Sequence, residues 1–205
     1  NCGAYFTEGG FRLQDWTVEY GQPPTGPVDL VGALIRSCNP YFWHIGLDLF
    51  FTDPFLVPKI ARGFGLGAAT GIEAIAEATG QIPDPDWKQQ TKGEAWQAGD
   101  SVNSATGQGD VQATVVQIAR MVAAVGNDGT LYRPQVILKI VPPGGAPTFE
   151  FAPEVQGQLP VSKEHLIAIQ DGMIGVANAR NGTAAERMRG LGINVAGKTG
   201  TAEDP

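Results

Sequence analysis

The residues with the clearest chemical potential lie near the carboxyl end of the chain, where an apolar stretch leads into Lys198, Thr199, Gly200 and Thr201. This segment alternates like a strand, which would place the two threonines on one face and the lysine on the other. Two hydroxyls beside an ammonium can bind a carboxylate, Gly200 allows close approach to the backbone, and a strand-edge N–H can donate to an oxyanion. The segment therefore predicts a carboxylate-binding strand, although a surface strand with a solvated lysine has the same residues.

A second candidate site is the segment Ser-Cys-Asn-Pro at 37–40. Before it, apolar residues repeat at intervals of three and four over 28–35, which predicts a helix. Pro40 suits the first turn of a second helix, and Asn39 is well placed to cap that helix. Ser37 and Asn39 are thus predicted to lie on a tight connection between two core helices, which would hold their side chains rigidly. Helix capping alone would also explain both residues.

The rest of the chain is predicted to contain helices, strands and loops in irregular order. Capping residues and apolar periodicity predict helices opened by Asp53-Pro54, Thr114 and Ser162. The Thr114 helix is apolar over more than one stripe, so it is predicted to be a core helix with four inaccessible side chains, those of Val116, Ile118, Met121 and Val122. Strands are predicted over 135–141 and 193–201, an irregular excursion over 68–100 and a Pro/Gly loop over 142–161. Because helices precede and separate the strands without a regular βαβ rhythm, we expect an α+β fold.

Length and composition limit the classes of function. With 205 residues, 42% of them hydrophobic, the chain can bury a core and is expected to form one domain. Its formal net charge of −7 and its lack of a basic cluster argue against nucleic-acid binding. No apolar run approaches the ~20 residues of a membrane span, and the first residues lack a signal-peptide pattern.

No metal or other cofactor is expected. The two cysteines, Cys2 and Cys38, lack metal-ligand spacing, and only His44 and His165 could join them. We expect two small buried thiols, with a Cys2–Cys38 disulfide as the alternative in an oxidising compartment. The glycines of 63–67 lack the strand and the helix that a phosphate-binding loop needs, so they indicate a turn.

Together and in this order, the two candidate sites resemble a family signature. A Lys-Thr-Gly strand combined with Ser-x-x-Lys and a serine–asparagine element is typical of penicillin-recognising serine acyltransferases. The chain resembles the transpeptidase domain of class B penicillin-binding proteins, the peptidoglycan D,D-transpeptidases. The resemblance reaches across nearly the whole chain and is carried by the segments SCNPYFWHIG, FGLGAATGIEAIAEATGQIP, GDSVNSATGQGDVQATVVQIARMVAAVGNDGTLYRP, GMIGVANARNGTA and VAGKTGTAE. It implies a penicillin-binding transpeptidase or serine β-lactamase-like fold, in which an antiparallel sheet packs with a helical subdomain.

One element of the signature is absent. No lysine of the chain follows a serine by three positions, so no Ser-x-x-Lys nucleophile motif occurs within residues 1–205. In the family, that motif precedes the Ser-x-Asn element. We therefore expect residues 1–205 to be a partial transpeptidase domain, running from after the nucleophile helix to just past the Lys-Thr-Gly strand. Alone, it is expected not to form an acyl-enzyme.

The resemblance implies a role for each site residue that is present. Ser37 would belong to the proton-transfer network beside the missing serine–lysine pair, and Asn39 would hydrogen-bond the amide carbonyl of the substrate. Lys198 would supply positive potential and help to order Ser37. Ser37 and Lys198 are therefore predicted to lie close together in space.

The same resemblance implies a carboxylate subsite. The hydroxyls of Thr199 and Thr201, beside Gly200, would hold the terminal carboxylate of a D-Ala-D-Ala stem peptide or of a β-lactam. The N–H of Thr201 would form one half of an oxyanion hole. Gln108 would lie near the site, although a turn-stabilising role explains it equally well.

The implied reaction is acyl transfer through a serine ester that cross-links peptidoglycan. The implied partners are peptidoglycan stem peptides, β-lactam antibiotics and a cell-wall glycosyltransferase. The resemblance also implies a membrane anchor elsewhere in the protein and a catalytic domain outside the cytoplasmic membrane. Two alternatives remain open: a relative of the serine β-lactamases or β-lactam sensors, and a non-catalytic domain that acts as a scaffold.

Overall fold

The computed structural model describes residues 1–73 and 75–200, which form two compact units. Among the described residues, unit 1 is discontinuous in sequence and consists of residues 1–58, 83–110 and 162–200; unit 2 consists of residues 59–73, 75–82 and 111–161. The fold combines helices with short antiparallel strand pairs, so the predicted α+β class is confirmed. None of the helices in the described ranges is long and apolar enough to cross a membrane.

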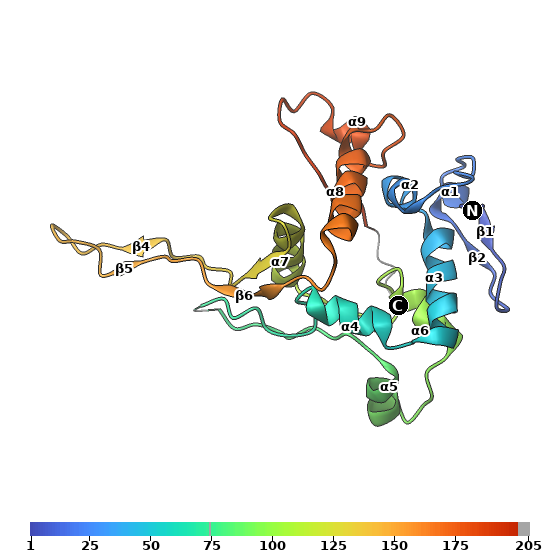
Figure 1. The fold of residues 1–205 in the computed structure, drawn as a ribbon, viewed down its shortest axis with the longest axis horizontal. Coiled ribbons are helices and arrows are strands. Elements are labelled where there is room, and N and C mark those ends of the chain that lie inside the picture. Colours follow the sequence, from blue (N-terminus) through green and yellow to red (C-terminus); the bar gives the residue numbers. More distant parts are fainter. Residues whose placement is uncertain (74, 201–205) are drawn as a thin grey trace. The chain divides into compact units, whose positions relative to one another are not determined.

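Unit 1 holds most of the helices and one short strand pair. Helix α2 packs against α8, and α3 packs against α6 (Figure 1). Strand β1 pairs with β2 in antiparallel register. The elements of unit 1 are β1 (Tyr5–Phe6), β2 (Leu13–Gln14), α1 (Trp16–Glu19), α2 (Leu30–Arg36), α3 (Asn39–Thr52), α5 (Pro85–Lys92), α6 (Ala98–Ser104), α8 (Lys163–Asn178) and α9 (Ala185–Met188), while α4 (Leu56–Gly63) crosses the boundary between the units.

The core of unit 1 depends on close approach of α3 and α6. A Cβ added to Gly46 on α3 would lie 2.7 Å from the carbonyl oxygen of Ser101 on α6, so only glycine permits this spacing. Beside the contact, a buried apolar cluster joins the two helices to β1; its members are Phe6, Trp43, Leu47 and Val102. This packing fixes α3, whose first turn carries Asn39.

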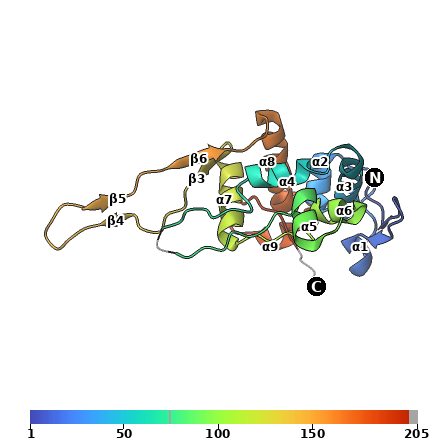
Figure 2. The ribbon, with the colours of Figure 1, turned by 90° about the horizontal axis from the view of Figure 1, so that it is seen from below.

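Unit 2 contains helix α7 (Val115–Gly126) and two strand pairs, besides the end of α4 and the segment that follows it. Strand β3 (Thr130–Tyr132) pairs antiparallel with β6 (Val155–Gln158), and β4 (Lys139–Ile140) pairs with β5 (Phe149–Glu150). The β4–β5 hairpin extends beyond the β3–β6 pair, away from α7 (Figure 2). The prediction that Thr114 caps α7 is confirmed, because its side chain accepts from the N–H of Gln117 at 3.2 Å.

The predicted burial of α7 is wrong. Val115, Ile118 and Val122 are 85%, 41% and 41% exposed, and Val116 and Met121 are only half-buried. The buried face instead follows a narrow stripe, formed by Gln117, Ala124 and Val125. Gln117 is fully buried because its side-chain amide donates to the carbonyl oxygens of two loop residues, Ala68 at 2.6 Å and Thr79 at 2.8 Å. The inward face of α7 therefore includes a polar side chain, that of Gln117, which anchors a loop through these hydrogen bonds.

Several predicted boundaries also need correction. The excursion over 68–100 is not irregular throughout, because Asp84 caps α5 and Pro85 opens it. The helix expected from Asp53-Pro54 begins at Leu56. The expected strand over 135–141 is only two residues long, and the expected loop over 142–161 contains β5 and β6. Strand pairing joins residues distant in sequence, so local patterns locate short strands poorly. Ser162 caps α8 as predicted, accepting from the N–H of His165 at 3.2 Å.

Candidate active site

Ser37 lies at the junction of α2 and α3. As the C-cap residue of α2 it adopts the left-handed conformation, with φ 50° and ψ 45°, and its N–H donates to the carbonyl of Leu34 at 3.1 Å. In the described ranges, Asp128 is the other non-glycine residue with positive φ. Such a conformation is uncommon for a residue with a Cβ, and it persists where the surroundings hold it.

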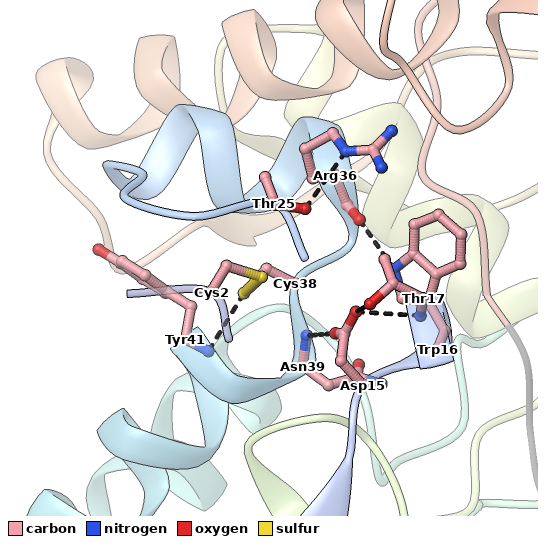
Figure 3. The surroundings of a disulfide bond; sticks show 9 residues. All are labelled: Cys2, Asp15, Trp16, Thr17, Thr25, Arg36, Cys38, Asn39 and Tyr41. Atoms are coloured by element: carbon pink, nitrogen blue, oxygen red, sulfur yellow. Dashed lines mark hydrogen bonds between the residues drawn. A yellow bond between two sulfur atoms is a disulfide. The ribbon is translucent and has the colours of Figure 1, made fainter. Parts of the chain in front are cut away.

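The residue after Ser37 is covalently fixed. Cys38 forms a disulfide with Cys2, and both residues are fully buried (Figure 3). The expectation of two free thiols is therefore wrong, and the alternative is confirmed; the pairing depends on the redox compartment, which residue patterns do not reveal. Cys38 is also the N-cap of α3, its Sγ accepting from the N–H of Tyr41 at 3.4 Å. The prediction that Asn39 caps α3 is wrong. Asn39 is the first residue of the helix, because the extended backbone that defines a cap falls at Cys38.

Residues of the N-terminal segment hold both flanks of Ser37. The indole Nε1 of Trp16 donates to the carbonyl oxygen of Arg36 at 3.0 Å, and a carboxylate oxygen of Asp15 accepts from the N–H of Asn39 at 3.1 Å (Figure 3). The other carboxylate oxygen of Asp15 accepts from the N–H and hydroxyl of Thr17, at 3.1 and 2.7 Å. Asp15 is only 1% exposed, so these donors replace the water that a buried carboxylate loses.

Lys198 reaches Ser37 from a distant part of the chain. Its Nζ donates to Ser37 Oγ at 2.7 Å, across 161 residues of sequence, and to the carbonyl oxygen of Thr199 at 2.7 Å. The predicted proximity of Ser37 and Lys198 is therefore confirmed. Nearby protein atoms partly desolvate the ammonium and lower the pKa of Lys198, although the residue as a whole is exposed. A lysine with a lowered pKa is nearer to the neutral form that can accept a proton.

The backbone before Lys198 is held by α8. The N–H of Gly197 donates to the carbonyl of Met173 at 3.0 Å, and the Asn178 side chain donates to the carbonyl of Val195 at 2.8 Å. No strand occurs over the described residues 193–200, so the predicted strand is wrong there. A strand needs a paired neighbour, and here helix α8 provides the contacts instead.

Of the two threonines in the predicted carboxylate subsite, Thr199 lies within the described residues. Thr199 Oγ1 lies 2.8 Å from Thr183 Oγ1. A Cβ added to Gly200 would meet nothing within 4 Å, which leaves room above this backbone. Thr201 lies outside the described residues. Gln108 lies in the turn after α6, where its N–H donates to the carbonyl of Asn103 at 2.9 Å; its place in the site stays a prediction.

Sequence reasoning missed Asp15, Trp16 and Thr183. Asp15 has a visible signal, because an aspartate before Trp-Thr-Val is typical of a helix N-cap, and it does cap α1. That signal reveals a cap and not the bond to Asn39. Thr183 follows Asn181-Gly182, which indicates a turn and gives no hint of Thr199.

The carboxylate and the two sulfurs near Ser37 do not fit a metal site in this state. Cys2, Asp15 and Cys38 offer ligand atoms within 4.8 Å of one another. The two sulfurs are bonded to each other, and the carboxylate accepts three hydrogen bonds. What the site offers chemically is an ammonium, a serine hydroxyl and a threonine hydroxyl.

Comparisons with known proteins identify the family. The penicillin binding protein transpeptidase domain family matches residues 2–204, and the chain belongs to it. Peptidoglycan D,D-transpeptidase MrdA of Acinetobacter baumannii is 30% identical over 193 residues, which are 94% of this chain and 27% of that protein.

Two solved structures share the fold. A chain in the complex between penicillin-binding protein PBP2 and MreC from Helicobacter pylori has a TM-score of 0.81 and 28% identity, over 98% of this chain and 34% of that one. A chain of a peptidoglycan synthase complex that couples polymerization and crosslinking has a TM-score of 0.80 and 30% identity, over 100% and 32%. The expected penicillin-binding transpeptidase fold is thus confirmed, and the chain spans about a third or less of these three proteins.

Proposed function

We propose that residues 1–205 are part of the transpeptidase domain of a peptidoglycan D,D-transpeptidase, which cross-links the cell wall and binds β-lactams. The observation that carries the proposal is the 2.7 Å hydrogen bond from Lys198 Nζ to Ser37 Oγ. It joins the Ser-x-Asn junction to the Lys-Thr-Gly segment, the two halves of the family signature within this chain.

In the proposed reaction, a serine outside residues 1–205 attacks the penultimate D-Ala carbonyl of a stem peptide. A serine ester forms, the amide C–N bond breaks, and the departing D-Ala amine takes a proton. An amine of a neighbouring strand then attacks the ester, so that a new amide forms and the serine oxygen recovers a proton. Ser37 and Lys198 form one hydrogen-bonded path for these protons, and the charge on Lys198 attracts the substrate carboxylate.

The remaining assignments follow the family resemblance. Asn39, fixed by Asp15 through its backbone, binds the amide carbonyl of the substrate. Thr199 and Thr201, beside Gly200, bind the terminal carboxylate, with the N–H of Thr201 as an oxyanion donor. Gln108 lines the approach to the site.

We propose further that the domain works outside the cytoplasmic membrane, in a protein that is membrane-anchored. The buried Cys2–Cys38 disulfide supports this, since disulfides persist in oxidising compartments. Relatives occur in a complex with MreC and in a peptidoglycan synthase complex. A glycosyltransferase partner and an MreC-type partner are therefore proposed for the whole protein.

The test uses the full-length protein, which is incubated with a fluorescent penicillin and with a stem-peptide substrate. We expect one stoichiometric covalent adduct, release of D-Ala, and cross-linked product. Lys198→Ala should reduce the rate of acylation by penicillin and the rate of cross-linking by about 100-fold each, the scale of a lost charge-assisted contact in an active site. Lys163→Ala, at the exposed start of α8, should not. Hydrolysis of the penicillin without cross-linking would contradict the transpeptidase assignment, and no adduct at all would contradict an acyl-serine mechanism.

A further inference from the structure

The loop that follows α8 contacts both halves of the candidate site. The guanidinium of Arg36 donates to the carbonyl of Asn181 at 2.6 Å, and the N–H of Thr183 donates to the carbonyl of Ile35 at 3.4 Å. Both partners lie at the end of α2, directly before Ser37. On its other side, Thr183 Oγ1 lies 2.8 Å from Thr199 Oγ1.

The position of this loop is fixed by a close backbone approach. A Cβ on Gly182 would collide with the carbonyl oxygens of Gly175 and Val176 on α8, which are backbone atoms that cannot move aside. The N–H groups on either side of Thr183 are also bonded, from Gly182 to the carbonyl of Ala179 at 2.8 Å and from Ala184 to the carbonyl of Val176 at 3.0 Å. The Thr183 hydroxyl is therefore presented from a constrained backbone.

From this geometry we infer that Thr183 is a positioning residue of the carboxylate subsite, whose hydroxyl orients the hydroxyl of Thr199. The inference rests on the proposed function, in which Thr199 binds the substrate carboxylate. A hydroxyl carries one hydrogen and two acceptor lone pairs. When Thr199 donates its hydrogen to a carboxylate, Thr183 must be the donor in the bond between the two threonines.

This arrangement does two things for the carboxylate. The Thr183 hydrogen occupies a lone pair of Thr199 Oγ1, which turns the Thr199 hydrogen away from Thr183 and toward the ligand. Accepting a hydrogen bond also polarises the Thr199 O–H group, so it becomes a better donor. Thr183 thus acts only on ligands whose carboxylate bonds to Thr199, and this selectivity separates it from a residue that merely stabilises the fold.

The experiment measures acylation of the full-length protein by one penicillin with a free carboxylate and by its methyl ester. The readout is the ratio of the two second-order rate constants on the same preparation, which is independent of the fraction of correctly folded protein. In Thr183→Val, a near-isosteric change that removes the hydroxyl, we expect the acid-to-ester ratio to fall by about 3- to 10-fold, the value of one hydrogen bond. Thr183→Ser should keep the wild-type ratio.

Matched variants make the outcome decisive. Thr91→Val removes a hydroxyl that bonds to the carbonyl of Trp87 on α5, and it should leave the ratio unchanged. If Thr183→Val does not fold, Thr183→Ala removes the same hydroxyl and is read in the same way. An unchanged ratio in the variants lacking the hydroxyl, whether both ligands slow equally or neither slows, would overturn the inference. A wild-type protein that neither ligand acylates would instead overturn the proposed function itself.

Discussion

At the scale of single residues, the site depends on a serine held in an unusual conformation. Ser37 has a left-handed backbone, and three nearby residues are each restrained: Arg36 bonds to Trp16, Cys38 to Cys2, and Asn39 to Asp15. The restraints act on backbone and sulfur atoms and leave the Ser37 hydroxyl to Lys198. Such rigid placement suits the proton-transfer role proposed for Ser37.

The charge of Lys198 gives a prediction on pH. Desolvation lowers the pKa of Lys198, so its ammonium loses the proton at a lower pH than an ordinary lysine would. Acylation by a carboxylate-bearing β-lactam should therefore decline on the alkaline side as pH rises through that lowered pKa. In Lys198→Arg the charge persists, because arginine does not deprotonate in proteins, and the alkaline decline should move to higher pH.

The check is the acylation rate of the full-length protein as a function of pH. Lys163→Arg, a substitution away from the site, serves as the control and should keep the wild-type profile. Identical alkaline limbs in wild type and Lys198→Arg would show that another group causes the decline.

At the scale of elements, the structure shows how helices bring distant segments to one place. Helix α2 ends at Ser37, and α3 begins two residues later. Residues of α8 hydrogen-bond to the backbone of Val195 and Gly197, just before Lys198. Glycines on α8 allow its packing against α2; a Cβ on Gly172 would lie 2.6 Å from the side chain of Leu34. The α2–α8 contact therefore helps to hold the candidate site together.

The Cys2–Cys38 disulfide gives a prediction at this scale. It closes a loop across 36 residues of sequence, and its removal should lower the free energy of unfolding by about 2–5 kcal/mol. The comparison is urea unfolding of the full-length protein and of the double variant Cys2→Ser, Cys38→Ser. Reductant should destabilise the wild-type protein to the level of the variant and leave the variant itself unchanged. Equal stability of the two proteins without reductant would contradict a stabilising disulfide.

Much of this arrangement could be predicted from local patterns, and the failures share one cause. The caps at Thr114 and Ser162 and the proximity of Ser37 to Lys198 were predictable, because capping is local and the motif order indicates one site. The burial of Gln117, the disulfide, the Asp15–Asn39 bond and the missing strand before Lys198 all depend on partners far away in sequence. Such partners are invisible to periodicity, which reports one element at a time.

At the scale of the whole molecule, the chain represents about a third or less of the length of the MrdA relative and of the two structures compared above. Residues 1–205 contain no Ser-x-x-Lys motif. An ammonium and threonine hydroxyls can attract a β-lactam carboxylate, but a covalent bond needs an activated nucleophile. Three positions after Ser37, where the motif has its lysine, this chain has Pro40.

The 205-residue chain alone should therefore form no stable adduct with penicillin. Intact-mass spectrometry after incubation checks this, next to the full-length protein, which should gain one penicillin. A stoichiometric adduct on the short chain, mapped to Ser37, would make Ser37 the nucleophile and contradict the role proposed for it.

The central claim is that Ser37 and Lys198 act as one catalytic unit, and a double-mutant cycle tests it most directly. The acylation rate of the full-length protein is measured for Ser37→Ala, Lys198→Ala and the double variant. If the 2.7 Å bond is functional, the product of the two single losses should exceed the loss in the double variant by about 10-fold or more, as for a hydrogen bond to a charged group. In the control cycle, Ser37→Ala is combined with Lys163→Ala, and the loss in that double variant should equal the product of the two single losses. Independent, multiplicative losses for Ser37 and Lys198 would contradict the claim.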